Sequence, residues 1–302
     1  MTFQHDITIA SAWQVGTDWF LPLDQPRLMG VLNVTPDSFS DGGQNMNPAR
    51  AVGRALRMIN EGADIIDIGG ESTRPGAKRI SDAQQIDRTV PVIEELHRHA
   101  DVLISIDTTR AKVAEAALDA GAKIINDVAA GRDDESMLSL AASRHCGLVL
   151  MHRLHPPGED SYSDRYHEAP QYKDVVAEVS DFLNRRALEA IKAGVDPASI
   201  VIDPGLGFGK TVEQNYRLIA HGTDFVEGGY PVLSGASRKS FIGTISDVEV
   251  PAERVFGSLA VSVAHWLMGV RLFRVHDVAQ HAQALAVARK IAPNGREIPT
   301  SP

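Results

Sequence analysis

A polar or charged side chain ends nearly every one of the short apolar runs that recur along this 302-residue sequence. Each has an ordinary structural explanation when taken alone. Asp107 and Asp203 fit helix caps, Asn126 fits a turn, and Lys239 or Arg274 fits an ion pair. The full set is Asn33, Glu71 to Arg74, Asp107, Asn126, Asp127, Met151, His152, Asp203, Ser237 to Lys239, and Arg274 to Asp277.

The set as a whole predicts a more specific chemistry. Two carboxylates and an amide, Asp107, Asp203 and Asn126, can hydrogen-bond a planar heterocycle that carries both donors and acceptors. Arg274 and His276, facing an asparagine from the first run, suit phosphate oxygens. The polar residues at the ends of the apolar runs therefore predict a pocket for a heterocycle beside a pocket for an anion.

The elements that must position these residues follow a strand–helix alternation. We expect strands at 27–33, 63–70, 102–107, 123–127, 147–152, 199–205, 231–237 and 270–276. Segments with helical spacing lie at 47–61, 81–99, 109–120, 134–145, 172–193, 212–220, 252–268 and 277–291. Eight such pairs predict an α/β fold, a single TIM (β/α)₈ barrel, whose functional groups lie at the carboxyl ends of the strands. An open doubly wound sheet is the alternative, although it usually has fewer strands.

The barrel is predicted to span residues 27–292. Residues 1–26 are expected to form an extra strand or hairpin that closes the base of the barrel, and residues 293–302 a C-terminal tail. The run 205–211 lacks the glycine spacing of a nucleotide phosphate loop, because Pro204 occupies a glycine position, so we expect a turn there.

Composition narrows the classes of partner. Apolar residues make up 43% and charged residues 23%, as in ordinary globular proteins. The formal net charge of −9 argues against a nucleic-acid partner. No run is long enough to span a membrane, and the start shows no targeting segment. Cys146 is the single cysteine, which indicates a reducing compartment, so we expect a cytoplasmic protein.

Several long segments resemble the signatures of the dihydropteroate synthase family. They are NVTPDSFSDGG at 33–43, DIGGESTRPGA at 67–77, SIDTTRAKVAEAALDAGAKIINDV at 105–128, DPGLGFGKTVEQN at 203–215, GASRKSFIG at 235–243 and RVHDV at 274–278. The resemblance extends from about Leu28 to Val278. It implies an enzyme that joins p-aminobenzoate to a dihydropterin diphosphate and releases pyrophosphate.

The resemblance also implies roles for individual residues. The pterin would be bound by Asp107, Asn126, Met151, Asp203 and Lys239, and the diphosphate by Asn33, Arg274 and His276. The p-aminobenzoate site would comprise Phe39, Thr73, Arg74, Pro75, Phe208 and Ser240. The catalytic groups would be Asp41, Asp107, Asp203 and Lys239.

The family chemistry needs no strong base, because the arylamine is already neutral. It needs stabilisation of the leaving diphosphate and of positive charge on the pterin, which predicts a dissociative, SN1-like substitution. Mg²⁺ on the diphosphate, with Asn33 as its protein ligand, is the expected cofactor. A homodimer is expected from the family, through the apolar helix at 255–268.

Two alternatives stay open at this point. A pterin-binding methyltransferase domain would share the aspartate and asparagine pocket but would not need residues that bind a diphosphate. The residues that argue for the synthase instead are Asn33, Arg238 to Lys239 and Arg274 to His276. A catalytically silent, regulatory pterin-binding homologue is the other. Residues 153–158, which depart from the usual family pattern, are the feature that favours it.

Overall fold

Eight parallel strands form a barrel in the computed structural model, which describes residues 11–35 and 48–292. The strands are β3 (Arg27–Asn33), β4 (Ile65–Gly69), β5 (Leu103–Asp107), β6 (Ile124–Asp127), β7 (Gly147–Met151), β8 (Ile200–Asp203), β9 (Leu233–Ser234) and β10 (Leu272–Val275). Their order is β8-β7-β6-β5-β4-β3-β10-β9, and a parallel bridge between Ile202 and Val232 joins the two ends. The predicted barrel is confirmed.

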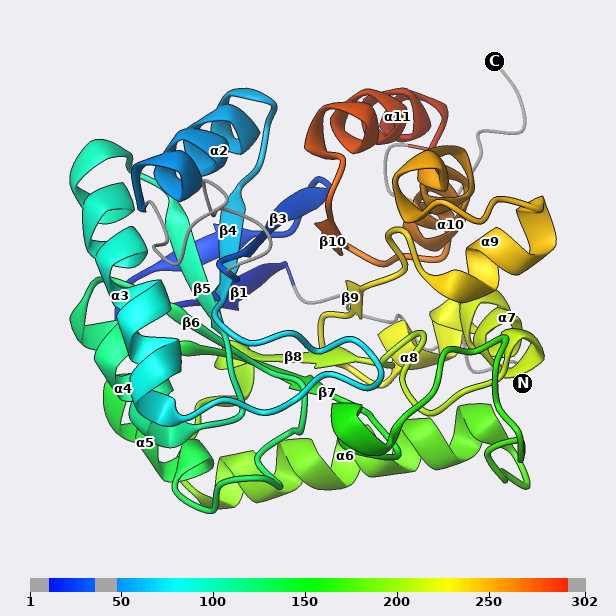
Figure 1. The fold of residues 1–302 in the computed structure, drawn as a ribbon, viewed down its shortest axis with the longest axis horizontal. Helices are drawn as coiled ribbons and strands as arrows, with labels where there is room; N and C mark the ends of the chain where they lie inside the picture. The colour runs from blue at the N-terminus through cyan, green and yellow to red at the C-terminus, as the bar shows by residue number, and fades with distance from the viewer. Residues whose placement is uncertain (1–10, 36–47, 293–302) are drawn as a thin grey trace, which may run out of the picture.

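Helices surround the strands, as Figure 1 shows. They are α2 (Pro48–Asn60), α3 (Asp82–His99), α4 (Ala111–Asp119), α5 (Met137–Arg144), α6 (Val175–Lys192), α7 (Val212–Ala220), α8 (Gly222–Glu227), α9 (Ser240–Ser246), α10 (Val255–Leu267) and α11 (Val278–Ile291). The main core lies between the helices and the outward faces of the strands, where Ile66, Ile68 and Ile106 pack. No helix within residues 11–35 and 48–292 has the length and apolar character required to cross a bilayer.

Several helices begin later than their sequence pattern predicts, because polar side chains end the preceding turn. Asp174 accepts the Val176 N–H at 3.0 Å and thereby caps α6 at Val175 instead of Tyr172. Asp134 accepts the N–H groups of Ala111 and Ser136, which leaves it in a turn before α5. Helices α8 and α9 were not predicted.

A hairpin covers the amino-terminal end of the barrel. It consists of β1 (Ala12–Gln14) and β2 (Phe20–Pro22), which pair antiparallel. Trp13 is fully buried, and its indole N–H donates to the Ser199 carbonyl at 2.8 Å. A Cβ on Gly147 would lie 2.9 Å from the Trp13 ring, so only glycine lets the indole approach β7 this closely. The barrel is therefore closed at this end, and any site must open at the other.

Candidate active site at the carboxyl ends of the strands

The inward-facing residues of the barrel change character along its axis. The layer nearest the amino-terminal end of the strands packs with Trp13 and is apolar. It consists of Met29, Ile65, Leu103, Ile124, Val149, Val201, Leu233 and Leu272. Because side chains alternate along a strand, the next inward positions lie two residues further on. They are Val31, Asp67, Ser105, Asn126, Met151, Asp203, Gly235 and Arg274. The change from apolar to polar marks the floor of a site.

Arg274 joins two carboxylates across this floor. Its Nε donates to Asp67 Oδ2 at 2.7 Å, and its Nη2 donates to Asp107 Oδ2 at 2.8 Å. The Asn126 amide also donates to Asp67 Oδ2, at 3.1 Å. Both carboxylates raise the pKa of Arg274 although its burial acts in the opposite direction. The guanidinium is therefore a fixed cation that uses two of its five N–H groups here.

Sequence reasoning assigned no role to Asp67, which proves central. It lies in the middle of the strand Ile65–Gly69 and is fully buried, with Ile66 and Ile68 packing outward on either side. The signal that could have found it is strand alternation, since an ionisable residue at an inward position of an apolar strand must meet a partner inside the barrel.

Each of the two carboxylates at the floor has one oxygen that accepts no hydrogen bond from the described residues. Asp67 Oδ1 and Asp107 Oδ1 are buried and have no hydrogen-bond partner among the residues that the structure describes. Burial raises the pKa of Asp107, while Arg274 opposes the shift. Buried acceptors of this kind are rare in folded proteins unless a ligand or water satisfies them. The floor is thus suited to a ligand edge rich in N–H donors.

A pocket above the floor brings together most of the predicted pterin residues. Asn126, Met151, Asp203, Lys239 and Arg274 line it, with Thr73, Val128, Gly205, Leu206, Phe208 and Gly235. One wall of the pocket is apolar, because it is formed by a small hydrophobic cluster of Met151, Phe208 and Val128. An apolar wall facing a row of carboxylates and cations fits a flat, polar heterocycle.

Lys239 and Asp203 supply opposite charges in the same pocket. The Lys239 ammonium lies 3.8 Å from the centroid of the Phe208 ring. Burial and then Arg274 lower the pKa of Lys239 to about 8, whereas Asp203 and Asp107 act against the shift. Burial raises the pKa of Asp203. The Gly205 N–H donates to Asp203 Oδ1 at 2.7 Å, and this hydrogen bond acts against the rise in pKa.

The residues predicted for the diphosphate lie at the neighbouring strand ends. Asn33 ends β3, and a Cβ built on Gly69 would lie 3.7 Å from both Asn33 Oδ1 and Asp107 Oδ2. The side chains of His276 and Ser237 are hydrogen-bonded, with His276 Nδ1 3.1 Å from Ser237 Oγ. Burial, followed by the positive charge of Arg274, lowers the pKa of His276 to about 3. His276 is therefore a neutral group beside a cation.

The predicted p-aminobenzoate residues are placed less uniformly. Thr73 and Phe208 line the pocket, and Ser240 follows Lys239 as the first residue of α9. Pro75 is half-buried and Arg74 is exposed on the loop after β4. Phe39 and Asp41 lie outside the described residues.

Lys210 supports the loop that carries Phe208. It is fully buried, and its Nζ donates to the carbonyls of Gly205 at 3.0 Å and Phe208 at 2.9 Å and lies 2.9 Å from His152 Nδ1. A Cβ on Gly205 would lie 1.8 Å from the His152 carbonyl oxygen, so the turn requires glycine there. The run 205–211 is thus a turn built around a buried lysine.

Within residues 11–35 and 48–292, no group of three or more His, Cys, Asp or Glu side chains is arranged to hold a metal ion. Asn33 is an oxygen donor at the mouth, next to Asp107. Magnesium commonly takes one or two protein oxygens and completes its coordination with substrate phosphates and water. The residues present fit a magnesium ion that arrives with a diphosphate and do not form a closed metal cage.

A closed barrel with a heterocycle pocket and an adjoining cationic rim defines an enzyme of the (β/α)₈ class that binds a flat, polar ligand. The family model described as pterin binding enzyme matches residues 29–276. The dihydropteroate synthase of Mycobacterium leprae is 46% identical over 267 residues, which cover 86% of this chain and 92% of that protein.

Solved structures agree with this comparison. The structure of Xanthomonas albilineans dihydropteroate synthase with 4-aminobenzoic acid has a TM-score of 0.85 and 43% identity, and the match covers 93% of this chain and 98% of that one. The same organism's enzyme in complex with 7,8-dihydropteroate has a TM-score of 0.81 and 40% identity, covering 92% and 98%. The chain belongs to the pterin-binding enzymes and, within them, to the dihydropteroate synthase family. The predicted resemblance is confirmed.

Proposed function

We propose that the protein condenses p-aminobenzoate with (7,8-dihydropterin-6-yl)methyl diphosphate to give 7,8-dihydropteroate and pyrophosphate. One observation carries the proposal: Asp203, Lys239 and Arg274 line a single pocket, and Arg274 is held there by Asp67 and Asp107. Relatives at 41–46% identity that carry the name dihydropteroate synthase support it.

The proposed roles follow from this charge arrangement. Asp107, Asp203 and Asn126 would bind the amino-pyrimidine edge of the pterin, because carboxylate and amide oxygens match its N–H donors. Lys239 would donate to a ring acceptor, and Met151 would pack on the ring. We add Asp67 as the group that holds both Arg274 and Asn126 in place.

The proposed reaction is dissociative. The bond between the exocyclic methylene carbon and the diphosphate oxygen breaks, and its electron pair leaves with pyrophosphate. The buried carboxylates of Asp107 and Asp203 stabilise the positive charge that remains on the pterin. The arylamine nitrogen then forms the new C–N bond and loses a proton to solvent.

The leaving group is proposed to lie at the cationic rim. His276 is a neutral hydrogen-bond donor there, and Arg274 has N–H groups beyond those used by Asp67 and Asp107. Mg²⁺, with Asn33 as its protein ligand, would neutralise charge on the departing diphosphate. Thr73, Arg74, Pro75, Phe208 and Ser240, together with Phe39 and Asp41, are proposed to bind and cover p-aminobenzoate.

Two further properties belong to the same proposal. The protein is proposed to form a homodimer through α10 and its neighbours, because Phe256, Ile245 and Val250 expose 80%, 66% and 50% of their surface. We also propose a cytoplasmic location, since the single thiol, Cys146, is buried and forms no disulfide.

The proposal is tested by p-aminobenzoate-dependent pyrophosphate release from the purified protein in the presence of magnesium. Asp203→Ala and Arg274→Ala should each lower turnover at least ~100-fold, because each removes a charged contact to the transition state. Circular dichroism checks that both variants keep the fold. Near-normal turnover in either variant would show that the site is assigned wrongly.

A further inference from the structure

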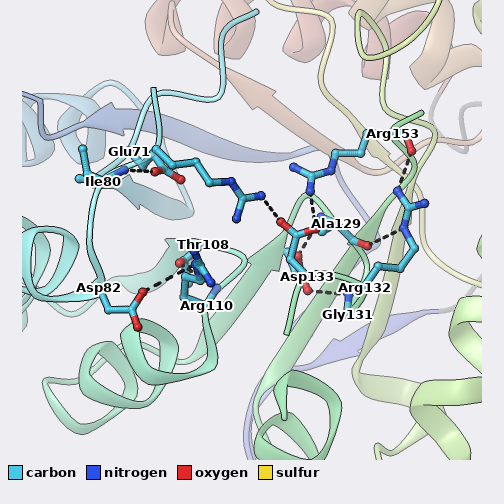
Figure 2. A network of polar contacts seen from close by, with 12 residues as sticks. Glu71, Ile80, Asp82, Thr108, Arg110, Ala129, Gly131, Arg132, Asp133 and Arg153 are labelled. Carbon is cyan, nitrogen blue, oxygen red and sulfur yellow. Dashed lines mark hydrogen bonds and ion pairs between the residues drawn. The ribbon is translucent and has the colours of Figure 1, made fainter. Parts of the chain in front are cut away.

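Asp133 joins two arginines that come from two different loops. One carboxylate oxygen, Oδ1, accepts from Arg153 Nη2 at 2.5 Å, and the other, Oδ2, accepts from Arg79 Nη2. Arg79 lies near the end of the loop that follows β4, and Arg153 lies just after β7. Asp133 itself follows β6, so the three residues connect the ends of β4, β6 and β7 across the intervening β5. Figure 2 shows this network, with Asp133 at its centre.

Hydrogen bonds hold the base of the network in place. The Asp127 carboxylate accepts the Ala129 N–H at 2.8 Å and the Gly131 N–H at 2.6 Å, which fixes the turn that presents Asp133. Arg132 Nη2 donates to the Arg153 carbonyl at 2.7 Å. The Arg153 side chain is only 3% exposed, so its charge depends on the Asp133 carboxylate.

The loop that follows β4, residues 71–80, is held at two more points. Its ends are joined by the Ile80 N–H, which donates to Glu71 Oε1 at 2.7 Å. Its tip is joined to the segment 153–158 by the Gly76 N–H, which donates to the Pro157 carbonyl at 2.8 Å. The segment that departs from the usual family pattern is therefore the one that holds this loop.

The loop carries Thr73, which lines the pocket together with Phe208 and Asp203. Because Thr73 is a proposed p-aminobenzoate residue, the position of the loop should affect the binding of that substrate. The pterin floor, made by Asp67, Asp107 and Arg274, is formed by the strands and needs no contact with the loop. A change in the loop should therefore affect the binding of the aryl amine much more than the binding of the pterin.

We propose that Asp133 is a positioning residue for the second substrate: with Arg79 and Arg153 it clamps the loop 71–80 over the pocket and so sets the affinity for a neutral aryl amine bearing a carboxylate. We name the three side chains the Asp133 clamp. The substrate's identity rests on the function proposed above, whereas the ordering of the loop does not.

Arg79→Gln is the sharpest variant, because Arg79 is 39% exposed and its replacement should not disturb the core. We expect the KM for p-aminobenzoate to rise about tenfold, which corresponds to ~1.4 kcal/mol. The KM for the dihydropterin diphosphate should change less than about twofold. Asp133→Asn should act in the same way, and Arg79→Lys, which keeps the charge, should restore most of the affinity.

Arg110→Gln is the matched control. Arg110 lies on the same rim, is 35% exposed and pairs with Asp82 at 3.7 Å. Among the described residues it forms no hydrogen bond or ion pair with the loop or with Asp133. Amide hydrogen exchange supplies the second measurement. Residues 72–79 should exchange faster in Arg79→Gln and Asp133→Asn than in the wild type and in Arg110→Gln.

Unchanged exchange in the loop, or equal effects on both KM values, would overturn the Asp133 clamp while leaving the function intact. A wild-type protein that forms no dihydropteroate would contradict the proposed function instead. In that case the exchange experiment alone decides whether Asp133 orders the loop.

Discussion

Arg274 Nε lies 2.7 Å from Asp67 Oδ2. Asp67, which had no predicted role, therefore holds the arginine that was predicted to bind the diphosphate. The same Asp67 oxygen accepts from Asn126. One carboxylate thereby fixes both a predicted diphosphate residue and a predicted pterin residue. This shared contact couples the two halves of the site.

Asp67→Asn is the first prediction. It removes the negative charge opposite Arg274, which should release the guanidinium and lower kcat/KM for the dihydropterin diphosphate by about 100-fold. The control is Asp64→Asn near the start of the same strand, where Asp64 pairs with Arg27 at 2.9 Å beneath the barrel. We expect the control to keep its activity. Equal loss in both variants would show that the effect of Asp67 is on folding.

The second prediction concerns pH. The ammonium form of Lys239 is present below its pKa of about 8 and is lost above it. Because the proposed role needs the cation, kcat/KM should fall as the pH rises through about 8. Lys239→Arg keeps its charge throughout this range, so its profile should lack the alkaline fall, although its rates are lower. An alkaline fall that persists unchanged in Lys239→Arg would contradict the assignment.

Lys210→Met is the third prediction. The substitution removes the Lys210 donor from the Phe208 carbonyl and from His152 Nδ1, whereas the Gly205 carbonyl keeps the Phe208 N–H as a donor. Urea denaturation should show a loss of about 2 kcal/mol in the free energy of unfolding, as for other unsatisfied buried acceptors. Lys192→Met, which removes a 71% exposed side chain on α6, is the control and should change stability by less than about 0.5 kcal/mol. Comparable values for both would refute the structural role of Lys210.

The fourth prediction tests the proposed homodimer. Phe256→Glu places a charge on the exposed apolar surface of α10 and should yield monomers in light scattering at micromolar concentration. Leu188→Glu, on the exposed face of α6, changes a residue of 54% exposure and should leave the dimer intact. A wild-type protein that is monomeric at that concentration would contradict the dimer.

The sequence was most informative where local patterns decide the structure. Apolar runs ended by polar residues identified all eight barrel strands, because a strand in a parallel barrel is buried on both faces. The same rule placed Asp107, Asn126 and Asp203 at the carboxyl ends of their strands. Helices α8 and α9 escaped prediction, since six and seven residues are too few to display a helical period.

The remainder depended on contacts between distant segments. Asp67 pairs with a residue 207 positions further along the chain, and no local pattern reveals such a partner. The Asp133 clamp likewise joins Arg79 to an aspartate 54 positions away. Residues 153–158 deviated from the family pattern, and only their contact with the loop 71–80 gives that deviation a physical meaning.

The most direct test of the account is the stoichiometry of products. Purified protein would be incubated with p-aminobenzoate, (7,8-dihydropterin-6-yl)methyl diphosphate and magnesium, and both products quantified in one sample by chromatography. We predict equal amounts of 7,8-dihydropteroate and pyrophosphate, formed only when both substrates are present. Binding of the pterin diphosphate without either product would contradict the proposed activity and favour a catalytically silent pterin-binding protein.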